Sequence, residues 1–267
     1  MSFRSLIKYY YFNYSPFVAG SFDYYGTTVY FPKNSYIFKL ACSQGIYEYN
    51  NLNTIISLLK PKSTFIDIGA NIGLMSVPIL KSCPDIDVIS VEPSVNSLPY
   101  LKKTHNNSIY KNRWKIVDRA MGTDEGEVEM SVLINNDMGA FDSISKNNTD
   151  RIGSSTSQKV KISCLDNLWL NMNKPLISFI KIDVEGYEMN VLNGSKKCIT
   201  ENKPSILLEW NKKHLASFNF NIDIILKFAE DLNYRLLAIP NLQVVESLTM
   251  LKILMTQTES YLLIPNN

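Results

Sequence analysis

Three acidic residues close short apolar runs, and together they suit a ligand that carries an ammonium group and hydroxyls. Asp67 closes the run TFIDI, Glu92 closes DVISVE and Asp118 closes WKIVD. At neighbouring strand ends, the first carboxylate could bind the ammonium group and the second could accept hydrogen bonds from two ribose hydroxyls. The third could reach the edge of an adenine. Any one of them could simply cap a turn, but the ordered set favours a ligand site.

The segment FIDIGANIG (65–73) distinguishes three classes of cofactor. A P-loop needs a lysine directly after its last glycine, whereas Leu74 follows Gly73 here. A dinucleotide site needs glycine where Asn71 stands, and Asp67 would repel its phosphates. S-adenosylmethionine carries an ammonium group and ribose hydroxyls but no phosphate. The segment therefore favours S-adenosylmethionine, with Gly69 and Gly73 letting the backbone approach it closely.

A second segment, FIKIDVEGYE (179–188), places two acids between a predicted strand and a predicted helix. Either Asp183 or Glu185 could orient or deprotonate a substrate hydroxyl, or together they could hold a divalent metal. In the alternative, Glu185 caps the helix that begins near Tyr187, and Asp183 binds neighbouring backbone amides. His214, just after the run ILLEW, is a further catalytic candidate, although a histidine there is more often an ordinary surface residue.

Strands that alternate with helices must position these residues. The chain contains strand-like apolar runs at 64–68, 87–92, 114–118, 177–183 and 204–210, and later at YRLLAI and SYLLIP. Helical segments separate most of them, which predicts a doubly wound α/β fold with a mostly parallel seven-stranded sheet and helices on both faces. No clear helix separates the last two runs, so one antiparallel edge strand is expected.

Two regions lie outside this alternating pattern. Residues 1–45 are rich in aromatic residues and contain TTVYF and YIFKL, which predict short strands and turns. We therefore expect an N-terminal extension over 1–45 and one domain over 46–267. The aromatic arm could stack on sugars, lie at a membrane surface or, more ordinarily, pack against the domain or a second subunit. The polar stretch 134–157 is predicted to be a loop long enough to act as a lid.

Composition excludes several classes of function. Lys and Arg total 27 and Asp and Glu total 25, so the net charge of +2 does not indicate a nucleic-acid partner. The sequence contains no run of 18 uncharged apolar residues, so no transmembrane segment is predicted. The four cysteines form no C-x-x-C pair, which excludes zinc fingers. Free, partly buried thiols suit a reducing compartment, so a cytoplasmic location is expected.

These segments together resemble the FkbM-type methyltransferases, a branch of the S-adenosylmethionine-dependent class I methyltransferases. The resemblance spans about residues 45–212 and rests on GIYEYNN, FIDIGANIG, VISVEPS, AMGTDEGEVEM, FIKIDVEGYEMNVLNG and ILLEW. It implies methyl transfer from S-adenosylmethionine to a hydroxyl of a sugar in a glycan or glycosylated metabolite. By position, the implied cofactor residues are Asp67, Gly69, Asn71, Gly73 and Glu92, to which the argument from strand ends adds Asp118. The resemblance also places Asp183 and Glu185 at the reaction centre.

Other functions remain as alternatives at this point. The acceptor could be an RNA ribose, a protein side chain or a small phenol, or the chain could be a catalytically silent binding module. A silent module need not keep the whole cofactor set, which argues against it. A divalent metal and a homo-oligomer are left open, and no residue is assigned to a metal. The partner that we expect is a carbohydrate or a glycosylated small molecule.

Overall fold

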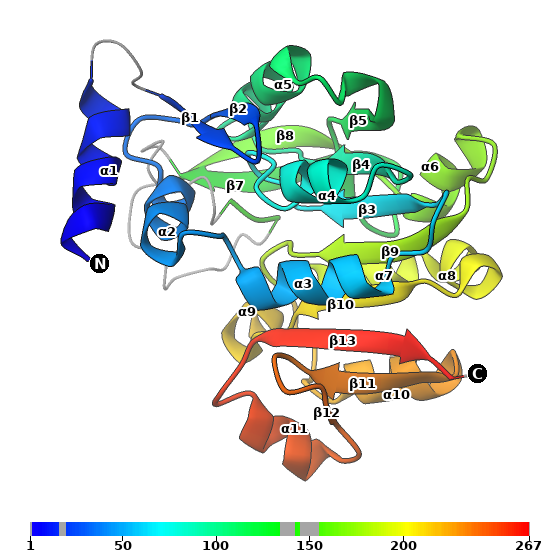
Figure 1. Cartoon of the computed structure of the whole chain (residues 1–267). Coiled ribbons are helices and arrows are strands. Elements are labelled where there is room, and N and C mark those ends of the chain that lie inside the picture. Colours follow the sequence, from blue (N-terminus) through cyan, green and yellow to red (C-terminus); the bar gives the residue numbers. More distant parts are fainter. Residues whose placement is uncertain (1, 16–19, 134–141, 145–154, 267) are drawn as a thin grey trace.

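A large mixed sheet forms the centre of the protein. The computed structural model describes residues 2–15, 20–133, 142–144 and 155–266 (Figure 1). The strand order of this sheet is β12-β11-β13-β10-β9-β3-β4-β5. Its strands are β3 (Thr64–Ile68), β4 (Asp87–Val91), β5 (Trp114–Val117), β9 (Ile177–Ile182), β10 (Ser205–Glu209), β11 (Tyr234–Ala238), β12 (Gln243–Val244) and β13 (Ser260–Pro265).

The predicted doubly wound fold is confirmed. Strands β10, β9, β3, β4 and β5 run parallel, so their carboxyl ends share one edge. The antiparallel strand β13 lies between β10 and β11 rather than at the edge. The edge itself carries the two-residue strand β12, which pairs antiparallel with β11 and brings the seven expected strands to eight. All residues of β3 and β9 are buried, as in strands covered on both faces.

Two hydrophobic cores cover the two faces of the sheet. Because successive side chains of a strand point to opposite faces, Phe65 packs in one core and Ile66 in the other. Helices α3 (Tyr49–Leu58), α4 (Ser76–Ser82) and α5 (Leu98–Asn107) contribute to the core of Phe65. Helices α6 (Leu165–Asn171), α7 (Glu188–Asn193), α8 (Lys196–Asn202), α10 (Ile224–Asp231) and α11 (Leu248–Leu254) contribute to the core of Ile66. Figure 1 shows α3 and α4 lying across the sheet.

The N-terminal region differs in part from the prediction of strands and turns. It contains α1 (Phe3–Tyr14), β1 (Ser21–Tyr24), β2 (Thr27–Tyr30) and α2 (Tyr36–Gln44). The run TTVYF indeed contains a strand, but YIFKL begins a helix because the hydroxyl of Ser35 caps the backbone N–H of Phe38. Phe38 then stacks on Phe31 and joins the same core as Phe65. The division at residue 45 stays a prediction.

A smaller three-stranded sheet, with order β6-β8-β7, lies beside the large one. It consists of β6 (Ala120–Met121), β7 (Gly126–Leu133) and β8 (Ser155–Ser163). The predicted loop 134–157 therefore ends in a strand, while 134–141 and 145–154 lie outside the described residues. The remaining elements are η1 (Lys111–Arg113) and α9 (Lys212–Ala216).

Two expectations from composition can also be compared with the structure. All four cysteines are free; Cys198 is buried and the other three are half-buried, as predicted. In the described part of the chain, we find no helix with the length and apolar character needed to cross a membrane.

Candidate active site

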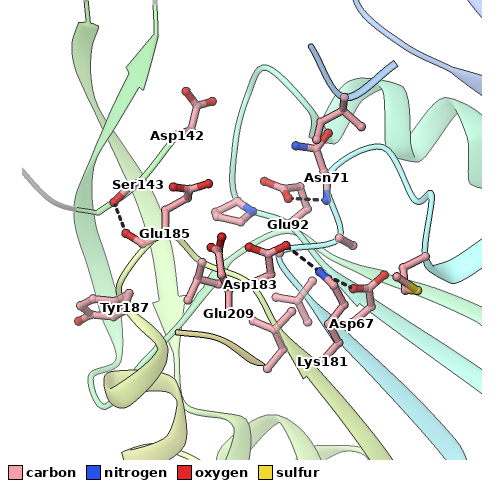
Figure 2. Close-up of a pocket in the computed structure, with 18 of the residues that line it drawn as sticks. Asp67, Asn71, Glu92, Asp142, Ser143, Lys181, Asp183, Glu185, Tyr187 and Glu209 are labelled. Carbon is pink, nitrogen blue, oxygen red and sulfur yellow. Dashed lines mark hydrogen bonds and ion pairs between the residues drawn. The ribbon is translucent and has the colours of Figure 1, made fainter. Parts of the chain in front are cut away.

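The acidic residues predicted from the sequence meet at the carboxyl edge of the parallel strands. A cavity of about 310 Å³ opens there, and its lining includes Asp67, Glu92, Asp183, Glu185 and Glu209 (Figure 2). A second cavity of about 460 Å³ shares five lining residues with the first: Glu48, Lys181, Asp183, Glu209 and Glu259. The sheet thus brings together side chains that are more than a hundred positions apart in the sequence.

The turn after β3 shapes the floor of the first cavity. The N–H groups of Gly69 and Ala70 both donate to the carbonyl of Val91 at 3.0 Å, which ties the turn to β4. Gly69 has φ +81°, and a Cβ there would lie 1.8 Å from the carbonyl oxygen of Asp183. Only glycine fits this close approach. Gly73 does not line the cavity, and a Cβ there would meet the side chains of Leu101 and Trp114; its assignment to cofactor binding stays a prediction.

Asp67 is fully buried beside a lysine that the sequence analysis missed. The hydroxyl of Ser76 donates to Oδ2 of Asp67 at 2.6 Å, and Nζ of Lys181 lies 3.9 Å from Oδ1. Oδ1 has no hydrogen-bond partner among the described residues. Burial raises the pKa of Asp67, and the nearby Lys181 ammonium opposes that rise. A ligand that donates a hydrogen bond to Oδ1 would complete this site.

Lys181 links Asp67 to the second motif. Its Nζ lies 3.0 Å from Oδ2 of Asp183, so the ammonium bridges two carboxylates from neighbouring strands (Figure 2). Burial disfavours the charged ammonium, but Asp183, Asp67 and Glu48 outweigh it and raise the pKa of Lys181. The sequence feature that could have identified this residue is that it is the one lysine within the apolar run ISFIKID. A buried lysine requires counter-charges, and Asp67 is its register partner on β3.

Glu92 fixes the turn that contains Asn71. Its Oε2 accepts from the backbone N–H of Asn71 and its Oε1 from that of Ser94, each at 2.8 Å. Each oxygen keeps a further lone pair that a ligand hydroxyl could use. Burial raises the pKa of Glu92 to about 7, which the two backbone hydrogen bonds counteract in part, while the carboxylates of Asp142 and Asp67 add to the rise.

The structure does not bring Asp118 into this group. Its carboxylate lies 2.8 Å from Nζ of Lys102, and both side chains are about half exposed. The hydrogen bond from Lys102 lowers the pKa of Asp118. Strand β5 ends at Val117, and the following side chain points toward α5 instead of into the cavity. The residues that line the cavity here are Arg119, Ala120 and Met121, so the prediction for Asp118 is not supported.

The His214 ring lies beside the carboxylates of Glu185 and Glu209. Nδ1 of His214, on α9, lies 3.5 Å from Oε2 of Glu185 and 3.8 Å from Oε2 of Glu209, at the end of β10. The structure thus brings the predicted candidates Glu185 and His214 together. The sequence analysis used ILLEW as a motif but gave Glu209 no role. Burial, followed by the carboxylates of Asp183, Glu185 and Glu188, raises the pKa of Glu209.

The backbone around Glu185 holds this arrangement in place. Glu185 has φ +58° and Gly186 has φ +102°, both in the left-handed region. Oε1 of Glu188 accepts from the N–H groups of Val184 and Gly186, at 3.2 and 3.0 Å. The helix after the motif is therefore fixed by Glu188 rather than by Glu185, which leaves the Glu185 side chain directed at the cavity (Figure 2).

The family model "Methyltransferase FkbM domain" matches residues 67–236. Among solved structures, the chain is similar to the methyltransferase FkbM from Methylobacillus flagellatus KT, with 15% identity, a TM-score of 0.49 and coverage of 85% of this chain and 53% of that one. It is also similar to a putative caffeoyl-CoA O-methyltransferase from Staphylococcus aureus, with 10% identity, a TM-score of 0.43 and coverage of 84% and 83%.

A third similar structure is TrmK from M. capricolum, solved in complex with S-adenosyl-homocysteine. Its identity is 10% and its TM-score 0.42, and the alignment covers 80% of this chain and 66% of that one. The chain spans about half the length of the M. flagellatus protein. A search of curated proteins finds no match.

Proposed function

The chain belongs to the FkbM methyltransferase family, and from this premise we propose that it transfers a methyl group from S-adenosylmethionine to a hydroxyl of a sugar in a glycan or glycosylated metabolite. S-adenosylmethionine is the methyl donor of this family. The observation that supports the proposal best is the first cavity, which has Asp67 and Glu92 on one side and Glu185 on the other (Figure 2). The cytoplasmic location of the protein stays a prediction.

The residues present fit the methyl donor. Oδ1 of Asp67 is buried and lacks a hydrogen-bond partner in the described structure, and such an atom is costly unless a ligand donates to it. Glu92 offers two oxygens that already accept one hydrogen bond each and could accept the two ribose hydroxyls. We assign Asp67, Gly69, Asn71 and Glu92 to cofactor binding.

The chemistry requires an acceptor oxygen behind the methyl group and a destination for its proton. S-adenosylmethionine supplies the methyl group on a positively charged sulfur. We assign Glu185 as the group that receives the hydroxyl proton. With S-adenosylmethionine bound, the acceptor oxygen would bond to the methyl carbon as the carbon–sulfur bond breaks, and the sulfur would keep the electron pair of that bond. Asp183, held by Lys181, positions the acceptor hydroxyl or the methionine end of the cofactor.

The polar second cavity supports a polyhydroxylated acceptor. Its lining combines hydrogen-bonding side chains such as Asn51, Gln257 and Ser260 with the carboxylates of Glu48 and Glu259. Sugar hydroxyls donate readily to such carboxylates. The cavity shares Asp183 and Glu209 with the first one, so an acceptor bound there would reach the methyl group.

The test is methyl transfer by the purified chain to a panel of sugars and oligosaccharides, followed by mass spectrometry. Parallel reactions contain RNA, peptides and small phenols as acceptors. A methylated sugar supports the proposal, while methylation of another acceptor alone refutes it. In Glu185→Gln we expect turnover to fall by about 10²–10⁴-fold, the contribution typical of a general base, with unchanged affinity for S-adenosylhomocysteine. Glu127→Gln, an exposed acid on β7, is the matched control. Full turnover in Glu185→Gln would contradict its assignment.

A further inference from the structure

We propose that Glu185, Glu209 and His214 form a binding site for a divalent first-row metal ion at the acceptor side of the cavity. One carboxylate oxygen from each glutamate and one imidazole nitrogen all lie within 4.8 Å of one another. The three residues come from the loop after β9, the end of β10 and helix α9, so the fold itself brings them together.

The spacing of these atoms suits ligands arranged around an ion. The imidazole Nδ1 lies 3.5 Å from Glu185 Oε2 and 3.8 Å from Glu209 Oε2. Metal–ligand bonds of about 2.1 Å at tetrahedral angles place ligand atoms about 3.4 Å apart. The two separations from His214 exceed this value only slightly, and the two glutamate oxygens lie within 4.8 Å of each other, so side-chain rotations would close the site around an ion.

Glu209 supplies an independent reason to expect a ligand. Its Oε2 atom is buried and has no hydrogen-bond partner within the described ranges. A buried carboxylate oxygen without a donor is unfavourable unless it is paired or coordinates a metal. The atom faces the His214 ring, so a cation between them would satisfy it.

The charge of the cavity also favours a cation at this position. Among the described residues, eight acids line the first cavity: Glu48, Asp67, Glu92, Asp142, Asp183, Glu185, Glu209 and Glu259. Its basic residues there are Arg119 and Lys181, and Lys181 is already paired with Asp67 and Asp183. Among the described lining residues, acidic side chains therefore outnumber basic ones.

The backbone prepares the three ligands before an ion arrives. Gly186 packs so closely on α9 that a Cβ there would lie 2.5 Å from the carbonyl oxygen of His214. The side chain of Asn211 caps the start of α9 by accepting from the N–H of Lys213 at 2.8 Å. Together these contacts hold His214 against the Glu185 turn, and a prearranged site costs less to close around an ion.

The donor set indicates which ions would bind. Carboxylate oxygens suit Mg²⁺ and Mn²⁺, whereas imidazole suits Zn²⁺ and other transition ions. Two carboxylates with one imidazole therefore favour Mn²⁺ or Zn²⁺ over Mg²⁺. Three protein ligands leave further coordination positions open, as in catalytic rather than structural sites.

The role of the ion, unlike its binding, rests on the proposed function. An acceptor hydroxyl that occupies an open coordination position would have its pKa lowered by the ion. The proton of the hydroxyl would pass to the second oxygen of Glu185. The acceptor oxygen would then attack the methyl carbon as described above. Glu185 would thus bind the ion through Oε2 and keep Oε1 for the proton.

Metal binding can be measured without any acceptor. The purified chain is treated with a chelator and titrated with Mn²⁺, and electron paramagnetic resonance reports the free ion. We expect one saturable site. Its affinity should fall by roughly tenfold or more in Glu209→Gln, which replaces a charged carboxylate with a neutral amide, and in His214→Asn, which removes the imidazole. Glu127→Gln should bind Mn²⁺ like the wild type. Competition with Zn²⁺ should displace Mn²⁺ more readily than competition with Mg²⁺.

Calorimetry with S-adenosylhomocysteine on the same samples separates this inference from the proposed function. Retained affinity in Glu209→Gln and His214→Asn shows that these variants are folded. Mn²⁺ binding without S-adenosylhomocysteine binding in the wild type would refute the methyltransferase proposal and leave the metal site supported. Absence of saturable Mn²⁺ and Zn²⁺ binding, or unchanged affinity in both ligand variants, would overturn the metal site.

Discussion

Lowering the pH from about 8 to about 6 is expected to weaken the binding of S-adenosylhomocysteine by about tenfold through Glu92. Burial raises the pKa of this carboxyl group to about 7. If its two oxygens accept the ribose hydroxyls, the carboxylate is the form that binds the ligand. Protonation removes lone pairs from that arrangement and adds a competing donor.

The magnitude follows from the ionised fraction. With a pKa of about 7, roughly nine-tenths of Glu92 is ionised at pH 8 and roughly one-tenth at pH 6. The apparent dissociation constant is the intrinsic constant divided by the binding-competent fraction, so the ratio between the two pH values is about ten. The weakening of binding at lower pH depends on the raised pKa of Glu92, because a carboxyl group with an ordinary pKa would stay ionised throughout this range.

Calorimetric titration of S-adenosylhomocysteine at three pH values, with Glu92→Gln as comparison, measures this effect. The variant should bind more weakly at pH 8 and show a smaller dependence on pH. Burial also raises the pKa of Glu188 to about 7, but Glu188 does not line the cavity and is unchanged in the variant. Equal pH dependence in the wild type and Glu92→Gln would refute the assignment of Glu92 to the ribose.

Two further predictions concern the turn after β3. Asp67→Asn removes the charge beside Lys181 but keeps the shape of the side chain. We expect this variant to show no measurable binding of S-adenosylhomocysteine in calorimetry. Affinity like that of the wild type would rule out Asp67 as a cofactor ligand. Gly69→Ala should lower the free energy of unfolding by about 2–5 kcal/mol in urea melts, because it adds a steric overlap with Asp183 to the cost of a positive φ. Gly26→Ala, at φ +75° with no atom within 4 Å, should lose only about 1–2 kcal/mol, and equal losses would show that the overlap is relieved.

The central strands could be predicted because burial on both faces leaves a plain signal. TFIDI coincides with β3, and the predicted run 177–183 contains β9. Helices α1 and α2 could not be predicted in the same way, since their aromatic residues also favour strands. Capping by Ser2 and Ser35 decides the outcome there, and the side chains of Tyr9, Phe12 and Phe38 then pack in the core of Phe65.

The site could be predicted where a residue type and a strand end coincide. Asp67, Glu92 and Glu185 line one cavity as expected. Asp118 also follows a strand, but Lys102 pairs with it outside the cavity, and sequence spacing does not reveal the direction of one side chain. The role of Lys181 depends on β3 lying beside β9, which joins strands separated by more than a hundred residues.

Lys181 divides the acidic edge into two parts with different chemistry. On one side it balances Asp67, so this carboxylate can remain charged while buried next to the cofactor position. On the other side it holds Asp183, and beyond Asp183 the carboxylates of Glu185 and Glu209 face His214 instead of the lysine. A fixed ammonium beside Glu185 would stabilise its carboxylate and weaken it as a base. The proposed metal ion has the same effect on Glu185, but it would offset that effect by lowering the pKa of the bound acceptor hydroxyl. The position of Lys181 therefore favours cofactor binding at Asp67 and proton transfer at Glu185.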